Sequence, residues 1–177
     1  MIEVTDDITL YPLSVDDIFK IFNTLNEERE YMREWLPFVD TTQDAEDTGN
    51  YVRYVLQTGG EQQFTIYYKD KFVGLAGFKD VDKDNHKTEI GYWLSQHAQG
   101  KGIMTQTVRR LLEYAFDEME MNRVQIKVAI NNKKSRNIPE KLGGFEVEGI
   151  ERDGELLVDN EYTDIAVYSL LKREYKK

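Results

Sequence analysis

The chain has 177 residues, a length typical of one domain with a substantial core, and 12% of them are aromatic, which argues against a disordered chain. It contains no cysteine, so disulfide bonds, zinc thiolate sites and a cysteine nucleophile are excluded, and a reducing compartment is permitted. The net charge of −10 disfavours a nucleic-acid partner and favours cationic ligands.

The amino-terminal stretch MIEVTDDITLYPLS lacks a basic region followed by an apolar run, and no segment is long enough to span a bilayer. We therefore expect a cytoplasmic protein without a membrane partner. No linker, repeat or low-complexity tract divides the sequence, which predicts a single domain over residues 1–177.

Helix signals dominate the first third of the chain. The elements expected there are a strand over residues 2–11, a helix over 15–28 that begins at Ser14, a helical region over 30–35 that stops at Pro37, and a helix that begins at Thr42 or Asp44 and ends at Gly59 and Gly60.

The middle of the chain predicts three antiparallel strands. Residues 63–78 form a hairpin around Lys69, Asp70 and Lys71, and a turn over 81–86 leads into a strand over 87–95.

The last part of the chain returns to alternating helices and strands. After the glycines of residues 100–102, apolar side chains recur at helical spacing, at Val108, Leu111, Leu112, Ala115, Phe116 and Met119. A strand over 123–130, a short helix over 135–144 and two closing strands over 145–152 and 155–171 follow. This order predicts a mixed α/β fold in which the strands over 87–95 and 123–130 run parallel, with the glycine loop at the carboxyl end of the first.

The stretch HAQGKGIMTQT, residues 97–107, places Gly100 and Gly102 directly before a helix. Such a turn exposes backbone N–H groups at the positive end of the helix and is typical of a phosphate site, although an ordinary strand-to-helix loop explains the glycines equally well. The pattern GxxxxGK[ST] is absent. Thr105 stands where the dinucleotide pattern GxGxxG needs its third glycine.

Metal chemistry has little support in the sequence. The two histidines, His86 and His97, have no zinc-type carboxylate pattern around them. Asp80, Asp82 and Asp84 have the spacing that opens a calcium loop, but the glycine and the bidentate glutamate of that loop are missing, so a solvated turn is expected. We predict no metal site.

Several motifs together resemble the GNAT superfamily of acetyl-CoA-dependent N-acetyltransferases. Residues 99–104, QGKGIM, are similar to its Q/R-x-x-G-x-G/A pyrophosphate loop. The stretches EYMREWLPFVD, EIGYWLSQHAQGKGIMT, NNKKSRNIPEKLGGF, VEGIERDGELL and DIAVYSLL resemble the RimJ/RimL type, the ribosomal-protein N-acetyltransferases, and within it the YdaF-like bacterial proteins. Met104 and the doubled Gly143-Gly144 depart from the usual pattern, and the extra glycine predicts a shifted end of the preceding helix.

The resemblance implies the GNAT fold, a central mixed, mostly antiparallel sheet of six to seven strands flanked by helices. It also implies acetyl-CoA as cofactor. The backbone around the glycine turn would hold the pyrophosphate, Lys101 would add charge at the rim, and the strand end would pair with the pantetheine arm, with an amide near Leu94 stabilising the oxyanion. The residues expected at the cofactor are Tyr92, Trp93, Leu94, Gln99, Gly100, Lys101, Gly102, Ile103, Met104, Thr105, Asn132 and Ser135.

Transfer of an acetyl group to an amine needs a general acid for the thiolate and a base for the amine. The resemblance implies Ser135 as the acid and Glu155 as the base, acting through a water. Without the resemblance, either Asn132 or Ser135 is the cap of the following helix, and Glu155 is an exposed carboxylate in a turn. Tyr168 is a spare candidate acid or a core tyrosine.

The segment Trp35, Leu36, Pro37 and Phe38 is either a hydrophobic plug between helices or, as the resemblance implies, the mouth of the acceptor site, to which Glu155 also belongs. Acidic residues near it, Glu30, Glu34 and Asp40, would attract a cationic amine or only face solvent.

The sequence thus predicts an acetyl-CoA-dependent N-acetyltransferase that acts by direct transfer in a ternary complex. The expected acceptor is the N-terminal amine of a protein or peptide of the ribosomal-protein type. A polyamine or aminoglycoside acetyltransferase and a non-catalytic CoA-binding module are the alternatives. Family members often pair, so a homodimer is also expected.

Overall fold

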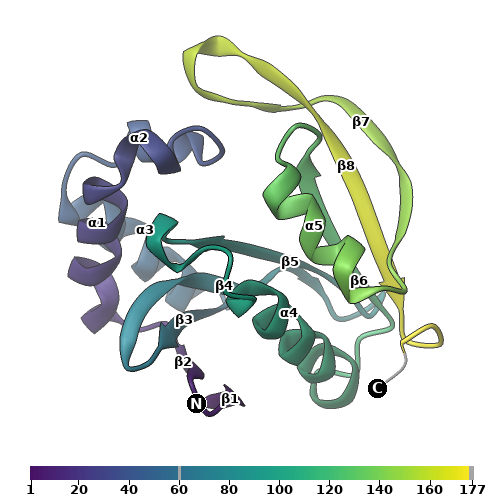
Figure 1. Ribbon diagram of the computed structural model, residues 1–177. Coiled ribbons are helices and arrows are strands. Elements are labelled where there is room, and N and C mark those ends of the chain that lie inside the picture. Colours follow the sequence, from purple (N-terminus) through teal and green to yellow (C-terminus); the bar gives the residue numbers. More distant parts are fainter. Residues whose placement is uncertain (60, 176–177) are drawn as a thin grey trace.

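The described part of the chain forms one mixed sheet of eight strands, in the order β1-β2-β3-β4-β5-β6-β8-β7 (Figure 1). The computed structural model describes residues 1–59 and 61–175. The strands are β1 (Ile2–Thr5), β2 (Ile8–Pro12), β3 (Gln62–Tyr68), β4 (Lys71–Asp82), β5 (Lys87–Leu94), β6 (Arg123–Ala129), β7 (Glu146–Leu156) and β8 (Tyr162–Leu171). The helices are α1 (Ile18–Glu27), α2 (Arg29–Met32), α3 (Ala45–Thr58), α4 (Ile103–Glu113) and α5 (Lys133–Leu142).

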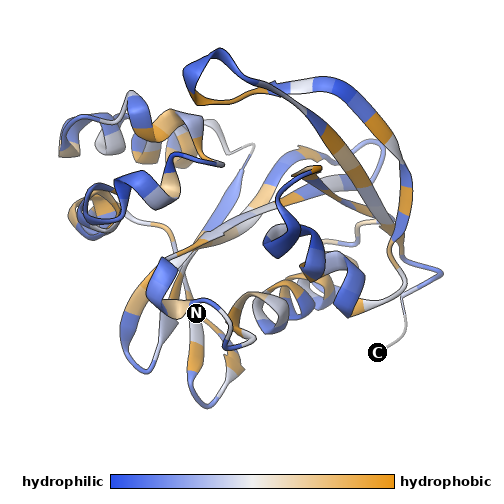
Figure 2. Cartoon of the chain, turned by 45° about the horizontal axis from the view of Figure 1, so that its top comes forward, coloured by the Kyte–Doolittle hydropathy of each residue, from blue (hydrophilic) through white to orange (hydrophobic). Residues whose placement is uncertain are grey.

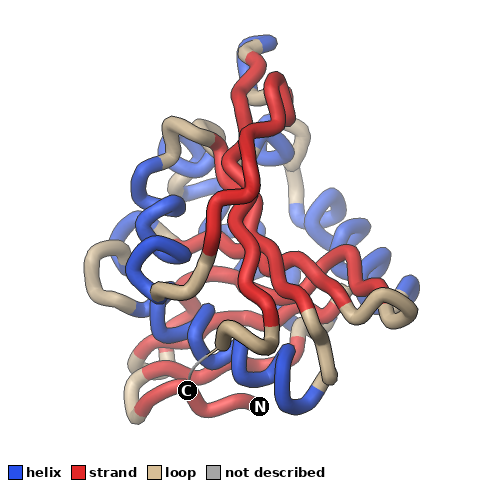
Figure 3. The backbone as a smooth tube through the Cα atoms, turned by 90° about the vertical axis from the view of Figure 1, so that its right-hand side faces the viewer, coloured by secondary structure: helices blue, strands red, loops and turns tan. Residues whose placement is uncertain are grey.

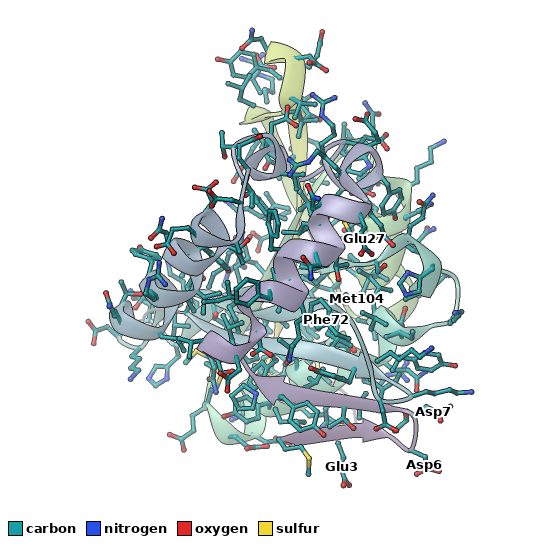
Figure 4. The ribbon with its side chains drawn as sticks, turned by 90° about the vertical axis from the view of Figure 1, so that its left-hand side faces the viewer. Glu3, Asp6, Asp7, Glu27, Phe72 and Met104 are labelled. Carbon is teal, nitrogen blue, oxygen red and sulfur yellow. The ribbon has the colours of Figure 1, made fainter. Side chains whose placement is uncertain are left out.

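The mixed, mostly antiparallel sheet confirms the predicted fold class, with more strands than the expected six to seven. The region expected as one strand over residues 2–11 is a hairpin of β1 and β2. The Thr5 hydroxyl accepts hydrogen bonds from the N–H groups of Asp7 and Ile8 and so closes a turn that a continuous strand cannot contain. Asp6 and Asp7 point away from this turn (Figure 4).

Local signals placed the boundaries of α3 well, and of the two predicted caps, Thr42 and Asp44, it is Asp44 that begins the helix. Asp44 caps α3 by accepting hydrogen bonds from the N–H groups of Glu46 and Asp47, and α3 ends at Gly59 in the left-handed conformation. Gly60, the other predicted end residue, lies outside the described residues, as do residues 176–177 of the predicted domain. The helical region expected over residues 30–35 is shorter, because α2 ends at Met32 and Pro37 opens a separate 3-10 turn.

The two closing strands pair as expected, but the hairpin turn is at residues 157–161 and not at Asp153-Gly154. β7 continues through this dipeptide as a bulge, with register shifts between Glu151 and Glu155. Asp153 has a φ of +49° and its N–H donates to the Asp164 carboxylate across the ladder, which anchors the bulge. The long β7–β8 hairpin rises beyond the rest of the sheet (Figure 3).

Helices cover the sheet on both faces, and each face has its own core. On one face α4 packs on the sheet around Phe64, Phe78 and Phe116, which are 0 to 2% exposed. On the other face α1–α3 cover a smaller core that includes Ile21 and Val52. Figure 2 shows hydrophobic residues alternating with hydrophilic ones along the helices and the strands. Burial of each large apolar side chain contributes about 2 kcal/mol to the stability of the fold. The two cores therefore hold the sheet and helices that surround the site in place.

The crossover β5-α4-β6 is parallel, as predicted, but the ladder between β5 and β6 is short. It pairs Lys87 with Arg123 and ends where Glu89 pairs with Gln125. Beyond that point β5 runs on to Leu94 and β6 to Ala129 without pairing each other. The two strands therefore diverge toward their carboxyl ends.

Candidate active site

Two adjoining cavities open where β5 and β6 diverge. The smaller, of about 340 Å³, lies between the end of β5, the start of α5 and the segment after α2. The larger, of about 610 Å³, lies between the sheet, helices α1 and α3 and strand β7. The residues that line both are Trp35, Leu36, Tyr92, Trp93, Asn132 and Ser135. A molecule in one cavity can therefore reach a molecule in the other at these side chains.

The glycine turn before α4 leaves its backbone open. Gly100 and Gly102 both have a φ of +74°, and a side chain at Gly100 would meet nothing within 4 Å. Ile103 and Met104 are 1% and 6% exposed, so they anchor the first turn of α4 in the core. The first turn of α4 carries no acidic residue and no side chain caps it. Its N–H groups are therefore available to bind an anion.

The side chains near this turn lie as follows. Gln99 donates from Nε2 to the Leu94 carbonyl over 3.3 Å, and Lys101 donates to the His97 carbonyl over 3.0 Å. The Lys101 ammonium also lies 5.6 Å from the centre of the Tyr68 ring. Of the residues expected at the cofactor, seven line the smaller cavity: Tyr92, Trp93, Leu94, Gln99, Met104, Asn132 and Ser135. Gly100, Lys101, Gly102, Ile103 and Thr105 form the turn and first helical residues beyond its wall.

The end of β5 offers backbone groups to the diverging gap. The N–H of Ser95 donates to the Val73 carbonyl of β4, and neighbouring residues of a strand face opposite edges. The N–H groups of Tyr92 and Leu94 therefore face the side on which the β6 ladder has ended. A strand-like amide chain can pair there.

Ser135 lies at the junction of the two cavities, in the first turn of α5. The helix is capped by Asn132, whose carboxamide oxygen accepts a hydrogen bond from the Ser135 N–H over 3.2 Å. The capping role that the sequence left open thus belongs to Asn132. The Ser135 hydroxyl takes no part in capping the helix and donates a hydrogen bond to the Tyr92 hydroxyl over 3.3 Å.

Glu155 lines the larger cavity from β7, just after the bulge. It is half-buried, and burial raises the pKa of its carboxyl above the ordinary value, with the nearby charge of Glu89 adding to the rise and that of Lys79 opposing it. The reading of Glu155 as an exposed turn carboxylate is wrong, because the bulge turns this residue toward the cavity. A raised pKa makes a carboxylate a better proton acceptor.

Sequence reasoning missed a row of charged residues across the floor of the larger cavity. Lys79 of β4 pairs with Glu89 of β5 over 2.8 Å, and Gln125 of β6 donates to the same carboxylate over 3.0 Å. Glu61 lines the cavity just before β3. The available signal was Glu89 itself, a charge inside the otherwise apolar run of β5, at a position that is only 3% exposed.

The segment 35–38 lies at the cavities and is not a plug. Trp35 and Leu36 line both cavities, and Pro37 and Phe38 line the larger one. The next residue, Val39, is the one that is fully buried, and it belongs to the core beneath the helices.

The three acidic residues near this segment have different surroundings. Glu34 lines the smaller cavity, and Glu30 is exposed on α2. Asp40 is paired with Arg33 over 2.8 Å, so its charge is offset.

The remaining candidates lie away from the cavities. Tyr168 is 1% exposed, and its hydroxyl accepts from Arg136 and donates to Glu140, so it belongs to the core and lines neither cavity. Among residues 1–59 and 61–175 no cluster of side chains could hold a metal ion. In the same ranges no helix is long and apolar enough to cross a membrane.

Comparison with known proteins identifies the class to which this fold and these cavities belong. The acetyltransferase (GNAT) domain family matches residues 7–144, and the chain belongs to this family. The protein is therefore an N-acetyltransferase, as the sequence motifs predicted.

Individual relatives span nearly the whole chain. The putative ribosomal N-acetyltransferase YdaF of Bacillus subtilis is 34% identical, over 98% of this chain and 96% of its own length. The ribosomal-protein-serine acetyltransferase of Escherichia coli is 27% identical, over 95% and 94%. The crystal structure of the microcin C7 self-immunity acetyltransferase MccE, in complex with acetyl-CoA and AMP, superposes with a TM-score of 0.89 at 26% identity, over 96% of this chain and 95% of that one. The predicted cofactor agrees with that complex.

Proposed function

We propose that this enzyme transfers the acetyl group of acetyl-CoA to the N-terminal amine of a protein or peptide, by direct transfer in a ternary complex. The observation that carries the proposal is the position of Ser135, which lines both cavities and so lies where donor and acceptor would meet. The names of the relatives support an acceptor of the ribosomal-protein type.

The residues present fit acetyl-CoA. Two exposed glycines precede α4: a side chain at Gly100 would meet nothing within 4 Å, and one at Gly102 would meet only the Gln106 side-chain amide, 3.7 Å away. This opening suits a pyrophosphate, and the diverging strands leave backbone groups of Tyr92 and Leu94 for an amide-containing arm. The bound cofactor would supply the acetyl thioester and a thiolate leaving group. Lys101 would have to leave the His97 carbonyl to reach an anion at the rim.

The chain's own groups then have separate tasks. The N–H of Leu94 would donate to the acetyl carbonyl oxygen and stabilise the negative charge that develops on it. Glu155 would remove the proton of the amine through a water, and Ser135 would give its hydroxyl proton to the departing sulfur as the carbon–sulfur bond breaks and take a proton back from solvent. No covalent enzyme intermediate forms, because the chain has no cysteine and no activated serine motif.

The cofactor site is tested by calorimetric titration of acetyl-CoA into the wild type and into Gly102→Trp. Gly143→Trp is a matched control, because Gly143 also has a positive φ, of +73°, with open space around it, at the far end of α5. Binding should be lost in Gly102→Trp and kept in Gly143→Trp. A folded wild type that binds no acetyl-CoA would contradict the proposal.

The acceptor is tested by a thioester-cleavage assay over peptides with free N-termini, their acetylated counterparts, polyamines and aminoglycosides. Turnover of free N-termini alone supports the proposal. Turnover only of polyamines or aminoglycosides would instead support the alternative small-molecule acceptor, for which the acidic lining of the larger cavity is the favourable observation.

The proposal also includes the domain organisation, the oligomeric state and the location of the protein. All eight strands found in residues 1–59 and 61–175 join one sheet, which supports one catalytic domain over the chain. The homodimer and the cytoplasmic location stay predictions. Light scattering on the purified protein measures the first.

A further inference from the structure

One end of the larger cavity contains an unsatisfied hydroxyl. Thr48 of α3 lines the cavity and is 4% exposed, and its Oγ1 has no hydrogen-bond partner among the described residues. A buried polar group without a partner lowers stability, so proteins rarely retain one without a use. Thr107, the other such hydroxyl in the described part of the chain, is on the buried face of α4 and lines neither cavity.

An unpaired carboxylate lines the same cavity. Within residues 1–59 and 61–175 Glu61 forms no ion pair or side-chain hydrogen bond, and burial raises the pKa of its carboxyl. The cation whose charge acts on Glu61, Lys79, is already paired with Glu89. Tyr51, also on α3, has a pKa raised to about 12 by desolvation and by the charge of Glu61, so its hydroxyl keeps its proton.

The charges of the larger cavity do not balance. The carboxylates that line it are Asp47, Glu61, Glu89 and Glu155, and the lysines are Lys79 and Lys127. Lys127 pairs with Glu151 outside the lining, and Asp47 is engaged by the backbone at the start of α3. Among the residues that the structure describes, Glu61 and Glu155 are left without a hydrogen-bond or ion-pair partner.

We propose that Glu61, together with the hydroxyls of Thr48 and Tyr51, binds a second cationic group of the acceptor, an ammonium or a guanidinium. The inference rests on the proposed function, in which Glu155 is reserved for the reacting amine. Glu61 supplies the opposite charge, and the hydroxyl oxygens accept the N–H groups that a buried cation must keep bonded. The cation comes either from a basic side chain next to a protein N-terminus or from the far amine of a diamine.

The test compares acceptors that differ only in this cation. Peptide amides that begin Ser-Lys and Ser-norleucine are titrated into the CoA-loaded protein by calorimetry, with 1,4-diaminobutane and butylamine as the second pair. The wild type should bind the member with two cations about tenfold more tightly, as expected for one charge-assisted hydrogen bond. Which pair shows the preference identifies the source of the cation.

Two variants and a matched control locate the preference. Glu61→Gln keeps the shape of the side chain and should abolish the preference while acetyl-CoA affinity stays unchanged. Asp80→Asn, the matched control, removes an exposed charge near Glu61 that lines neither cavity, and it should keep the preference. Thr48→Val should reduce the preference yet raise Tm, because it removes an unpaired buried hydroxyl; a purely structural Thr48 would leave binding unaltered.

Equal binding of both members of each pair by the wild type, or a preference that survives in Glu61→Gln, would overturn the inference. The titration does not require turnover. A protein that shows the Glu61-dependent preference but acetylates no amine contradicts the proposed function alone, whereas one that acetylates both peptides with equal affinity contradicts the Glu61 inference alone.

Discussion

The hydroxyls of Ser135 and Tyr92 lie 3.3 Å apart, and the Tyr92 hydroxyl in turn donates to the Ser135 carbonyl over 3.0 Å. Tyr92 thus fixes the direction of the Ser135 hydroxyl at the junction of the two cavities. Burial raises the pKa of Tyr92, so its proton stays in place to make the second of these bonds. The sequence pointed to Tyr92 only for its backbone.

Tyr92→Phe should lower kcat about tenfold and leave acetyl-CoA affinity unchanged, because it removes the orienting group and keeps the ring. Ser135→Ala should lower kcat about a hundredfold, the usual contribution of a general acid. Tyr168→Phe is the control: it loses the hydrogen bonds to Arg136 and Glu140 and should lower Tm without changing kcat. Steady-state kinetics and thermal melting measure both effects. An unchanged kcat in Tyr92→Phe would exclude the orienting role.

Glu155→Gln should lower kcat about a hundredfold and keep acetyl-CoA binding, because the amide cannot accept the proton. The same change should raise Tm at pH 7. The pKa of Glu155 is raised above its ordinary value of 4.5, so its charged form costs stability once the pH exceeds the folded pKa, and this cost is absent at pH below 4.5. Turnover equal to the wild type would remove Glu155 from the mechanism.

The pH profile offers a test of how Glu155 is tuned. The charge of Glu89 helps to raise the pKa of Glu155, while Lys79 lowers it. Glu89→Gln removes the first influence and releases Lys79, so the acid limb of kcat/KM should move to lower pH. Glu151→Gln, which removes the partner of Lys127, serves as the control and should leave the limb in place. A limb that does not move in Glu89→Gln would show that a group other than Glu155 titrates there.

Elements with strong local signals were predictable from the sequence. The start of α3 at Asp44, its end at Gly59 and the helix after Gly102 each depend on side chains within a few residues of the boundary. The parallel pairing of β5 and β6 followed from the order of elements, because two neighbouring strands that are joined through a helix run parallel.

The direction of Glu155 could not be read from the sequence, because Asp-Gly suits both a hairpin turn and a bulge. The choice depends on Asp164, eleven positions after Asp153, whose carboxylate holds the bulge in place. The Lys79–Glu89 pair and the cavity position of Glu61 likewise depend on sheet register and packing between distant segments. The spacing of apolar residues along the sequence carries no information about register or about packing between distant segments.

Glu28 connects the helical part of the chain to the loop before α4. One oxygen of its carboxylate lies 2.5 Å from the Ser95 hydroxyl, and the other accepts the Gln96 N–H over 2.7 Å. Glu28→Gln weakens these charge-assisted bonds and should raise KM several-fold for acetyl-CoA and for the acceptor together. Glu27→Gln, a neighbouring exposed residue at the end of α1 (Figure 4), is the control and should change neither KM. A change in one KM alone would contradict the coupling.

Glu148 of β7 connects the protruding hairpin to β6 across β8. Its carboxylate is held by Arg123 over 2.5 and 2.8 Å and by the Ser169 hydroxyl over 2.8 Å, and these partners lower its pKa to about 2. A lowered pKa stabilises the fold above the ordinary value of 4.5, and this stabilisation is lost as the pH falls through about 2. Because the carboxylate is 44% exposed, solvent reduces the effect to about 1 kcal/mol at pH 7.

Glu148→Gln should therefore lower the free energy of unfolding by about 1 kcal/mol at pH 7, measured by urea denaturation, with the difference from wild type shrinking as the pH falls from 5 toward 2. Glu146→Gln, on an exposed residue of the same strand, controls for the change in net charge and should be near neutral. Because Glu155 lies on the same strand beyond the bulge, loosening β7 at Glu148 should also reduce kcat at pH 7. A stability difference that is constant from pH 7 to pH 2 would mean that Glu148 acts through packing and not through its charge.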